Sequence, residues 1–154
     1  MNQDIKLDII DLSYEGKGIA RKDNLVYFVD NALDGETVIA KPYENKPKYA
    51  KAKAVKILNP SQNRTEPKCK VYDKCGGCSL RHMTYERQLK LKKDTVITNL
   101  KRMAHIEIQN LIVHPNPMPD HYRNKAEYQI LNDQIGFYAD RTHKIVTHDE
   151  CLLL

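Results

Sequence analysis

The amino-acid sequence predicts an α+β protein that is mainly β: a small barrel, followed by a cysteine-rich region with one long helix and a short antiparallel β unit. Three observations predict this class. Short runs of alternating apolar and polar residues, separated by turn residues, fill residues 1–58. Three of the four cysteines lie between Cys69 and Cys78, and a helix-favouring run extends from Thr84 to about Ala104.

The barrel is predicted from five short strands. Residues 4–12 alternate, with Ile5, Leu7 and Ile9 on one face. Five strands with regular turns are typical of an OB-like barrel, a fold that binds oligonucleotides. We therefore interpret residues 1–58 as an RNA-binding barrel. The other four strands are expected at residues 19–21, 25–29, 36–43 and 49–58.

The last strand of the barrel is expected to be basic on its outer face, because Lys51 and Lys53 share a face by their spacing of two. A polar segment bounded by prolines follows, and residues 59–68 are predicted to be a linker.

A long helix is predicted next, within a segment that spans residues 69–105. Thr84 is the expected N-cap, and Glu86 in the first turn complements the helix dipole. Its apolar residues fall near one face, and basic residues off that stripe are expected to line the exposed surface. The stripe comprises Tyr85, Leu89, Val96, Leu100 and Met103; the basic residues are Lys90, Lys93, Lys101 and Arg102.

Residues 106–154 are predicted to be an antiparallel β unit. Strands are expected at residues 126–131, 135–138 and 144–146, with a turn at Asn132 and Asp133. This unit would return the chain so that Cys151 meets the other three cysteines.

The positive charge is concentrated in the middle of the chain. Residues 41–102 carry 17 basic and 5 acidic side chains, a net charge of +12, whereas residues 1–40 and 103–154 are net acidic. Such an excess indicates a polyanionic partner. The alternative is that these lysines only solvate the surface.

No secretory signal and no apolar run near the ~18 residues of a membrane span is present, so we expect a cytoplasmic protein without a membrane partner. Disulfides are then disfavoured, because they persist in oxidising compartments. The spacing of the three clustered cysteines leaves two metal centres open. One is zinc on Cys69, Cys75, Cys78 and His82; the other is an iron–sulfur cluster with a remote fourth thiolate.

Three blocks of the sequence carry a family resemblance. The block from Cys69 through Cys75-Gly-Gly-Cys78 to Leu89, the run His121-Tyr-Arg-Asn-Lys-Ala126, and the stretch from Ile135 to Cys151 occur in that order. Together they resemble the bacterial 23S rRNA uracil-5-methyltransferases. The resemblance implies a [4Fe-4S] cluster on Cys69, Cys75, Cys78 and Cys151, with a structural and positioning role.

The N-terminal segment resembles the TRAM domain of the same methyltransferases, through Gly16 to Arg21, Val26 to Val29 and Leu33 to Glu36. The resemblance implies a protein that binds 23S rRNA and forms 5-methyluridine, and we expect it to be a monomer. The residues expected to contact RNA are Lys51, Lys53, Arg81, Lys93, Arg123 and Lys125.

The catalytic parts of such an enzyme are not found in this sequence. There is no glycine-rich loop between a strand and a helix for S-adenosylmethionine, and every cysteine is assigned to the cluster. We therefore expect residues 1–154 to be an N-terminal portion that transfers no methyl group alone and has no catalytic residue. The alternative is a free-standing RNA-binding module with zinc on Cys69, Cys75, Cys78 and either His82 or Cys151.

Overall fold

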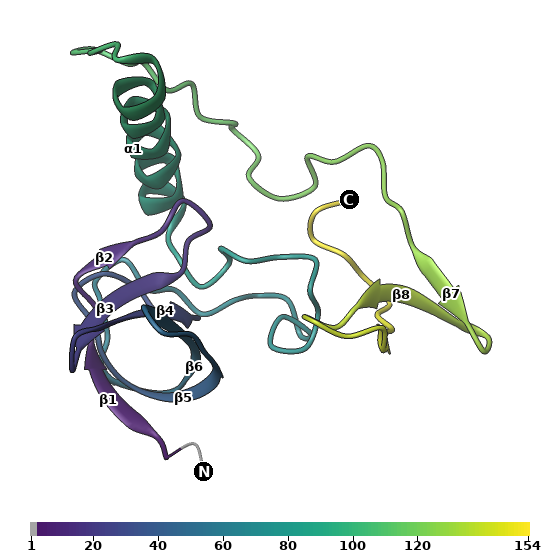
Figure 1. The fold of residues 1–154 in the computed structure, drawn as a ribbon. Helices are drawn as coiled ribbons and strands as arrows, with labels where there is room; N and C mark the ends of the chain where they lie inside the picture. The colour runs from purple at the N-terminus through teal and green to yellow at the C-terminus, as the bar shows by residue number, and fades with distance from the viewer. Residues whose placement is uncertain (1–2) are drawn as a thin grey trace. The chain divides into compact units, whose positions relative to one another are not determined.

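The computed structural model describes residues 3–154, so Met1 and Asn2 of the predicted barrel range lie outside the described residues. The chain divides into two compact units (Figure 1). The barrel unit comprises the described residues up to Thr65 together with His82–Val113. The cysteine unit comprises Glu66–Arg81 together with His114–Leu154. The predicted segment 69–105 is therefore shared between the two units.

A six-stranded sheet forms the barrel unit, in the order β1-β5-β6-β4-β3-β2. Neighbouring strands are antiparallel except β4 and β6, which run parallel. The register of β5 against β6 shifts at three places, and such bulges let a sheet curl strongly. The strands are β1 (Ile5–Asp8), β2 (Asp11–Leu12), β3 (Gly18–Lys22), β4 (Leu25–Asp30), β5 (Thr37–Asn45) and β6 (Tyr49–Asn59).

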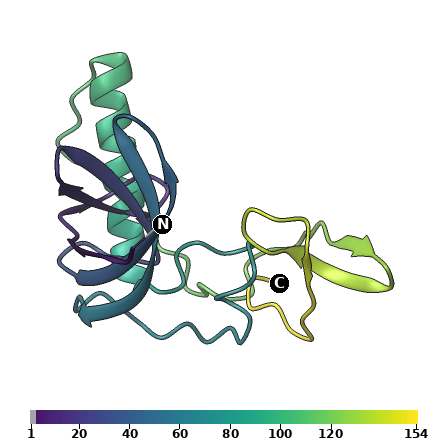
Figure 2. The same cartoon turned by 60° about the horizontal axis from the view of Figure 1, so that its bottom comes forward.

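The sixth strand arises because the predicted first strand, residues 4–12, is interrupted. Its first part, β1, pairs with β5, and its second part, β2, pairs with β3. The change of partner occurs at Ile9 and Ile10: the Ile9 N–H donates to Glu36 O (2.8 Å), and the Ile10 N–H donates to Ile19 O (2.8 Å). The sheet thereby closes on itself, as the ring of strands in Figure 1 shows; Figure 2 gives a second view of the same strands, turned by 60°.

The barrel core is built from aliphatic residues and many alanines. Ile5, Leu7 and Ile9 lie on the core side as predicted, and Leu7 and Ile9 are buried. On β6, Ala50, Ala52 and Ala54 are buried in alternation with lysines that point outward. Small side chains on an inner face allow a narrow barrel to be filled without voids.

The first part of the predicted linker packs against the barrel. Arg64 forms an ion pair with Glu36, whose carboxylate also accepts from the backbone N–H groups of Leu33 and Ser61. Glu36 is only 1% exposed. The segment after β6 is therefore fixed to the loop between β4 and β5.

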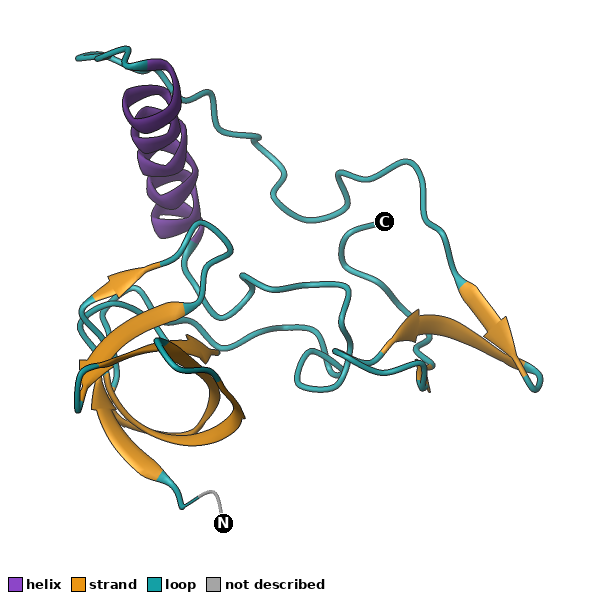
Figure 3. Ribbon diagram, in the orientation of Figure 1, coloured by secondary structure: helices purple, strands orange, loops and turns teal. Residues whose placement is uncertain are grey.

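Helix α1 (Tyr85–Ala104) follows in the barrel unit (purple in Figure 3). The predicted N-cap is confirmed, because the Thr84 hydroxyl accepts from the Arg87 N–H. The predicted apolar stripe is only partly buried: Tyr85, Leu89 and Leu100 are half-buried, whereas Val96 and Met103 are 44% and 81% exposed. The buried residues are Leu91 and Arg87, whose guanidinium pairs with Asp34 at 3.1 Å. Within residues 3–154, no helix combines the length and apolar character needed to cross a bilayer.

A three-stranded antiparallel sheet lies in the cysteine unit, as predicted, in the order β7-β8-β9. Asn132 and Asp133 form the tight turn between β7 and β8, with φ angles of 49° and 61°. Two successive positive φ angles are typical of the hairpin turn that matches the strand twist. The strands are β7 (Gln129–Leu131), β8 (Gln134–Tyr138) and β9 (Ile145–Val146).

Candidate metal centre

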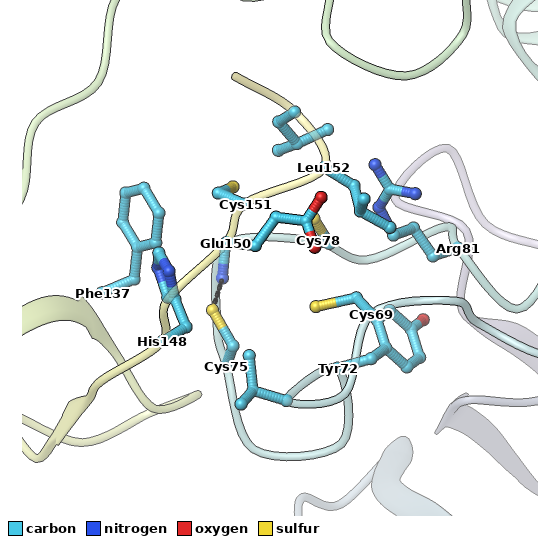
Figure 4. Close-up of a pocket in the computed structure, with 13 residues that line it drawn as sticks. Cys69, Tyr72, Cys75, Cys78, Arg81, Phe137, His148, Glu150, Cys151 and Leu152 are labelled. Carbon is cyan, nitrogen blue, oxygen red and sulfur yellow. Dashed lines mark hydrogen bonds between the residues drawn. The ribbon is translucent and has the colours of Figure 1, made fainter.

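The four cysteines, all free thiols, line one pocket of the cysteine unit (Figure 4). Three come from the loop between Cys69 and Cys78, and the fourth, Cys151, comes from the C-terminal segment. Each is partly buried. The structure therefore brings together the thiols that the sequence separates.

Local hydrogen bonds shape the loop that carries the first three thiols. The Tyr72 N–H donates to Cys69 O (3.2 Å), and the Cys75 N–H donates to Val71 O (2.8 Å). Beyond this turn, the Gly77 N–H donates to the Cys75 sulfur at 3.4 Å (dashed in Figure 4). An N–H directed at a sulfur stabilises its thiolate form.

Gly76 joins this loop to the small sheet. Its N–H donates to Tyr138 O at 2.9 Å, and Cys75 forms an isolated β-bridge with Ala139. A Cβ on Gly76 would lie 2.8 Å from Tyr138 O. The close approach of the two backbones therefore requires a residue without a side chain.

Backbone pairing also places Cys151. The His121 N–H donates to Leu152 O (2.9 Å), and the Arg123 N–H donates to Leu153 O (2.8 Å). These bonds hold the last residues beside the segment around Arg123, which fixes the direction from which Cys151 reaches the pocket.

Burial and mutual proximity govern the ionisation of the thiols. Burial raises the pKa of Cys75, against the Gly77 N–H that lowers it, and the charges of Cys69 and Cys151 raise it further. Burial likewise raises the pKa of Cys78, against hydrogen bonding and charge from Arg81. Several thiolates in one partly buried pocket repel each other, so their joint deprotonation requires a positively charged centre.

Aromatic side chains form one wall of the pocket. Phe137 stacks on His148 with ring centroids 5.6 Å apart, and Tyr128 lies 4.8 Å from Phe137. Phe137 and His148 line the pocket, as does Glu150. None of these three was identified from the sequence. The strand alternation does not signal Phe137, because Ile135, which shares its sheet face, is 54% exposed and does not line the pocket.

His82, the alternative zinc ligand, belongs to the barrel unit, where it is 1% exposed. The side chains that line the four-cysteine pocket include Cys151 and not His82. Of the two candidates for the fourth ligand, Cys151 therefore lines the pocket of the other three cysteines and His82 does not.

The residues predicted to contact RNA are distributed over both units. On β6, Lys53 is exposed, and Lys51 forms an ion pair with Glu44 at 2.9 Å. Lys93 lies on α1 and is half-buried.

The other three predicted RNA contacts lie in the cysteine unit. Arg123 and Lys125 line a second pocket, together with Phe137 and Cys151 of the first. Arg81 lines the four-cysteine pocket itself.

Comparison with known protein families identifies the domain type of the barrel. A family model described as the TRAM domain matches residues 2–55. The barrel is a TRAM domain. The match ends within β6, so the long helix and the cysteine unit lie beyond the TRAM domain.

Known RNA methyltransferases match nearly the whole chain. An uncharacterised RNA methyltransferase of Caldanaerobacter subterraneus is 40% identical, with 96% of this chain and 34% of the relative covered. One of Clostridium acetobutylicum is 36% identical, with 99% and 35% covered. The chain thus spans about one third of the length of the curated relatives it matches.

A solved structure has a similar fold. The tRNA (uracil-54, C5)-methyltransferase of Pyrococcus abyssi, in complex with S-adenosyl-L-homocysteine, superposes with a TM-score of 0.66 at 28% identity. The alignment covers 96% of this chain and 32% of that enzyme. The similarity therefore includes the TRAM domain and the segments that follow it.

Proposed function

We propose that this chain is the RNA-binding and [4Fe-4S]-bearing part of an S-adenosylmethionine-dependent methyltransferase that forms 5-methyluridine in 23S rRNA. The observation that carries the proposal is the convergence of four thiols on one pocket, in a chain that aligns over nearly its whole length with RNA methyltransferases. The proposal includes a cytoplasmic location and a monomeric state.

RNA binding is supported by the TRAM domain and by the positive charge of residues 41–102. Residues 41–102 carry a net charge of +12, and β6 presents Lys51 and Lys53 on the face opposite its buried alanines. Such a surface binds the phosphate backbone, with an affinity that falls steeply with salt.

The pocket fits an iron–sulfur cluster by its donor set: four thiols, an N–H directed at Cys75, and apolar cover from Phe137. Four thiolates are the usual ligand set of a [4Fe-4S] cluster, and they can also bind a single zinc ion, so the metal analysis described below decides between the two.

A bound cluster would supply four strong bonds that hold the loop of Cys69–Cys78 against the segment of Cys151. The chain's own residues have three further roles. Gly77 donates a hydrogen bond to the Cys75 sulfur, and Phe137 and His148 limit the access of water to the pocket. The basic surface binds RNA. Methyl transfer to uracil has no net redox step, so we assign the centre a structural and positioning role.

Methyl transfer itself is assigned to parts outside residues 1–154. Helix α1 connects β6 and β7, which belong to different sheets, so it is not the crossover of a parallel β–α–β unit. We propose that this chain alone does not methylate RNA. Labelled S-adenosylmethionine incubated with the chain and ribosomal RNA tests this: incorporation above background would contradict it.

The decisive experiment on the metal centre is anaerobic purification followed by iron, sulfide and zinc analysis. Brown protein with iron and inorganic sulfide in equal amounts is expected. Colourless protein with one zinc would instead support the second candidate, a zinc-binding RNA-binding module without enzymatic activity. Cys151→Ser should abolish iron binding, whereas His82→Gln should retain it.

The choice of RNA is tested by competition. Labelled 23S rRNA fragments bound to the chain are challenged with unlabelled tRNA and with unlabelled 23S rRNA at equal nucleotide concentration. Stronger displacement by 23S rRNA is expected. Stronger displacement by tRNA would contradict the proposal and would favour tRNA, the substrate named for the Pyrococcus abyssi enzyme.

A further inference from the structure

Arg81 is a largely buried cation at the four-cysteine pocket. Its side chain is only 15% exposed and lines the four-cysteine pocket (Figure 4). The Nη1 atom donates to Asp120 Oδ1 at 2.9 Å, and Cys78, three positions earlier, lines the same pocket. Among the residues that line this pocket, Arg81 is the only arginine or lysine.

Arg81 carries a positive charge inside the pocket, because a guanidinium is not deprotonated in proteins. The carboxylate of Asp120 pairs with it and partly compensates that charge. Asp120 lies 39 positions further along the chain, so it orients the guanidinium from a separate segment. A planar donor held in this way can contact a carboxylate and a sulfur together.

We propose that Arg81, oriented by Asp120, is a positioning and charge-compensating residue for the inorganic group on the four cysteines, and that it does not contact RNA. The inference rests on the proposed function, in which this group is a [4Fe-4S] cluster. Four thiolates outweigh the positive core, so such a cluster is an anion and becomes more negative on reduction. A fixed cation beside Cys78 stabilises the reduced form more than the oxidised form.

Glu150 places a negative charge near the same pocket as the positive charge of Arg81. Its side chain also lines the pocket, but the residue is exposed and its charge is screened by water. Removal of Arg81 would therefore leave the thiolates and a nearby carboxylate without a buried cation.

The test uses the full chain purified without oxygen, with three variants: Arg81→Gln, Arg81→Lys and Asp120→Asn. Two quantities are measured, the reduction potential of the cluster and its rate of loss to an iron chelator. Arg81→Gln should shift the potential to more negative values and speed cluster loss about 10–100-fold. Arg81→Lys should keep the potential near that of the wild type, because the charge is retained.

Asp120→Asn separates electrostatics from packing. Removal of the carboxylate leaves the guanidinium charge less compensated, so the potential should shift to more positive values, opposite to Arg81→Gln. A purely structural role would speed cluster loss in both variants without opposite shifts in potential.

Arg141→Gln is the matched control, because Arg141 is an arginine of the same unit that pairs with Asp140 at 3.0 Å and is 44% exposed. It should behave like the wild type. If the wild type holds no iron and sulfide, both the cluster and this inference are overturned. If the wild type holds the cluster and Arg81→Gln behaves like Arg141→Gln, only this inference is overturned. A fall of about one in the salt slope of RNA binding by Arg81→Gln would also overturn it.

Discussion

Glu36 and Arg64 form a two-point ion pair in the barrel unit: Nε donates to Oε1 at 2.6 Å and Nη2 donates to Oε2 at 2.8 Å. Burial of the carboxyl would raise the pKa of Glu36, but hydrogen bonds from Arg64 and from two backbone N–H groups outweigh burial and lower it. The pair therefore stays charged near neutral pH. It ties the chain after β6 to the loop before β5.

Loss of one partner of this pair should destabilise the protein strongly. Arg64→Met leaves the buried carboxylate without its cation, and such losses cost about 3–5 kcal/mol. The expected result is a large fall in the midpoint of thermal unfolding, followed by circular dichroism. Lys101→Gln is the control, because its pair with Glu107 is exposed at both ends and should contribute below ~1 kcal/mol. Equal effects of the two substitutions would contradict this view of the barrel unit.

His82 predicts a loss of stability in mild acid. Burial, reinforced by the charge of Arg64 and opposed by Glu36, lowers the pKa of His82 to about 4. The folded pKa lies below the unfolded value of about 6.5, so the unfolded state binds the proton first as the pH falls. The folded state therefore has its full stability above pH ~6.5 and loses stability progressively as the pH falls toward ~4. At ~1.4 kcal/mol per pH unit the loss reaches about 3 kcal/mol.

His82→Gln removes this titration and supplies the comparison. Urea unfolding of both proteins at pH ~7 and pH ~5 should show a smaller loss of stability for His82→Gln. Identical pH dependence of the two proteins would mean that the pKa of His82 is the same in the folded and unfolded states, which would contradict the prediction. Glu36 contributes at lower pH, because its stabilisation is lost only as the pH falls through its lowered pKa.

Gly76→Ala should loosen the contact between the cysteine loop and the small sheet. Its Cβ would lie 2.8 Å from Tyr138 O, a backbone atom that can move only with the sheet. Overpacking of this kind costs about 1–3 kcal/mol. Faster iron loss to a chelator is the expected readout. Ser79→Ala, an exposed position of the same segment, should leave iron retention unchanged.

Lys53→Gln should weaken RNA binding in a salt-dependent way. Removal of one phosphate contact reduces the slope of log affinity against log salt concentration by about 0.7–0.9. Fluorescence anisotropy over a salt series measures this slope. Lys6→Gln, on β1 in the acidic first part of the chain, makes the same chemical change and should leave the slope unchanged. Equal slopes for both variants would place the RNA surface elsewhere.

The sequence predicts those parts of the fold that depend on local pattern. The alternation of Leu7 and Ile9, the Thr84 cap and the Asn132-Asp133 turn are each set by neighbouring residues, and the structure has all three. The split of the first strand was missed, because it depends on β5 and β3 reaching Ile9 and Ile10 from opposite sides.

Ion pairs between residues far apart in the sequence explain other features that local patterns do not predict. Helix α1 buries Arg87 because Asp34 lies 53 positions earlier to receive it, and no periodic pattern signals such a partner. The ion pair of Arg81 with Asp120 is also not signalled by a local pattern, because Asp120 lies 39 positions later. The convergence of Cys151 with the other cysteines was expected from a resemblance, and no spacing rule predicts it.

The order of segments in the cysteine unit has a consequence for biosynthesis. Cys78 and Cys151 are separated by 73 positions, and residues of the barrel unit are interposed between them. During translation at ~5–20 residues per second, the first three thiols emerge roughly 4–15 seconds before the fourth. Any inorganic group that needs all four thiols can therefore be completed only after Cys151 has been synthesised, several seconds after its first three ligands.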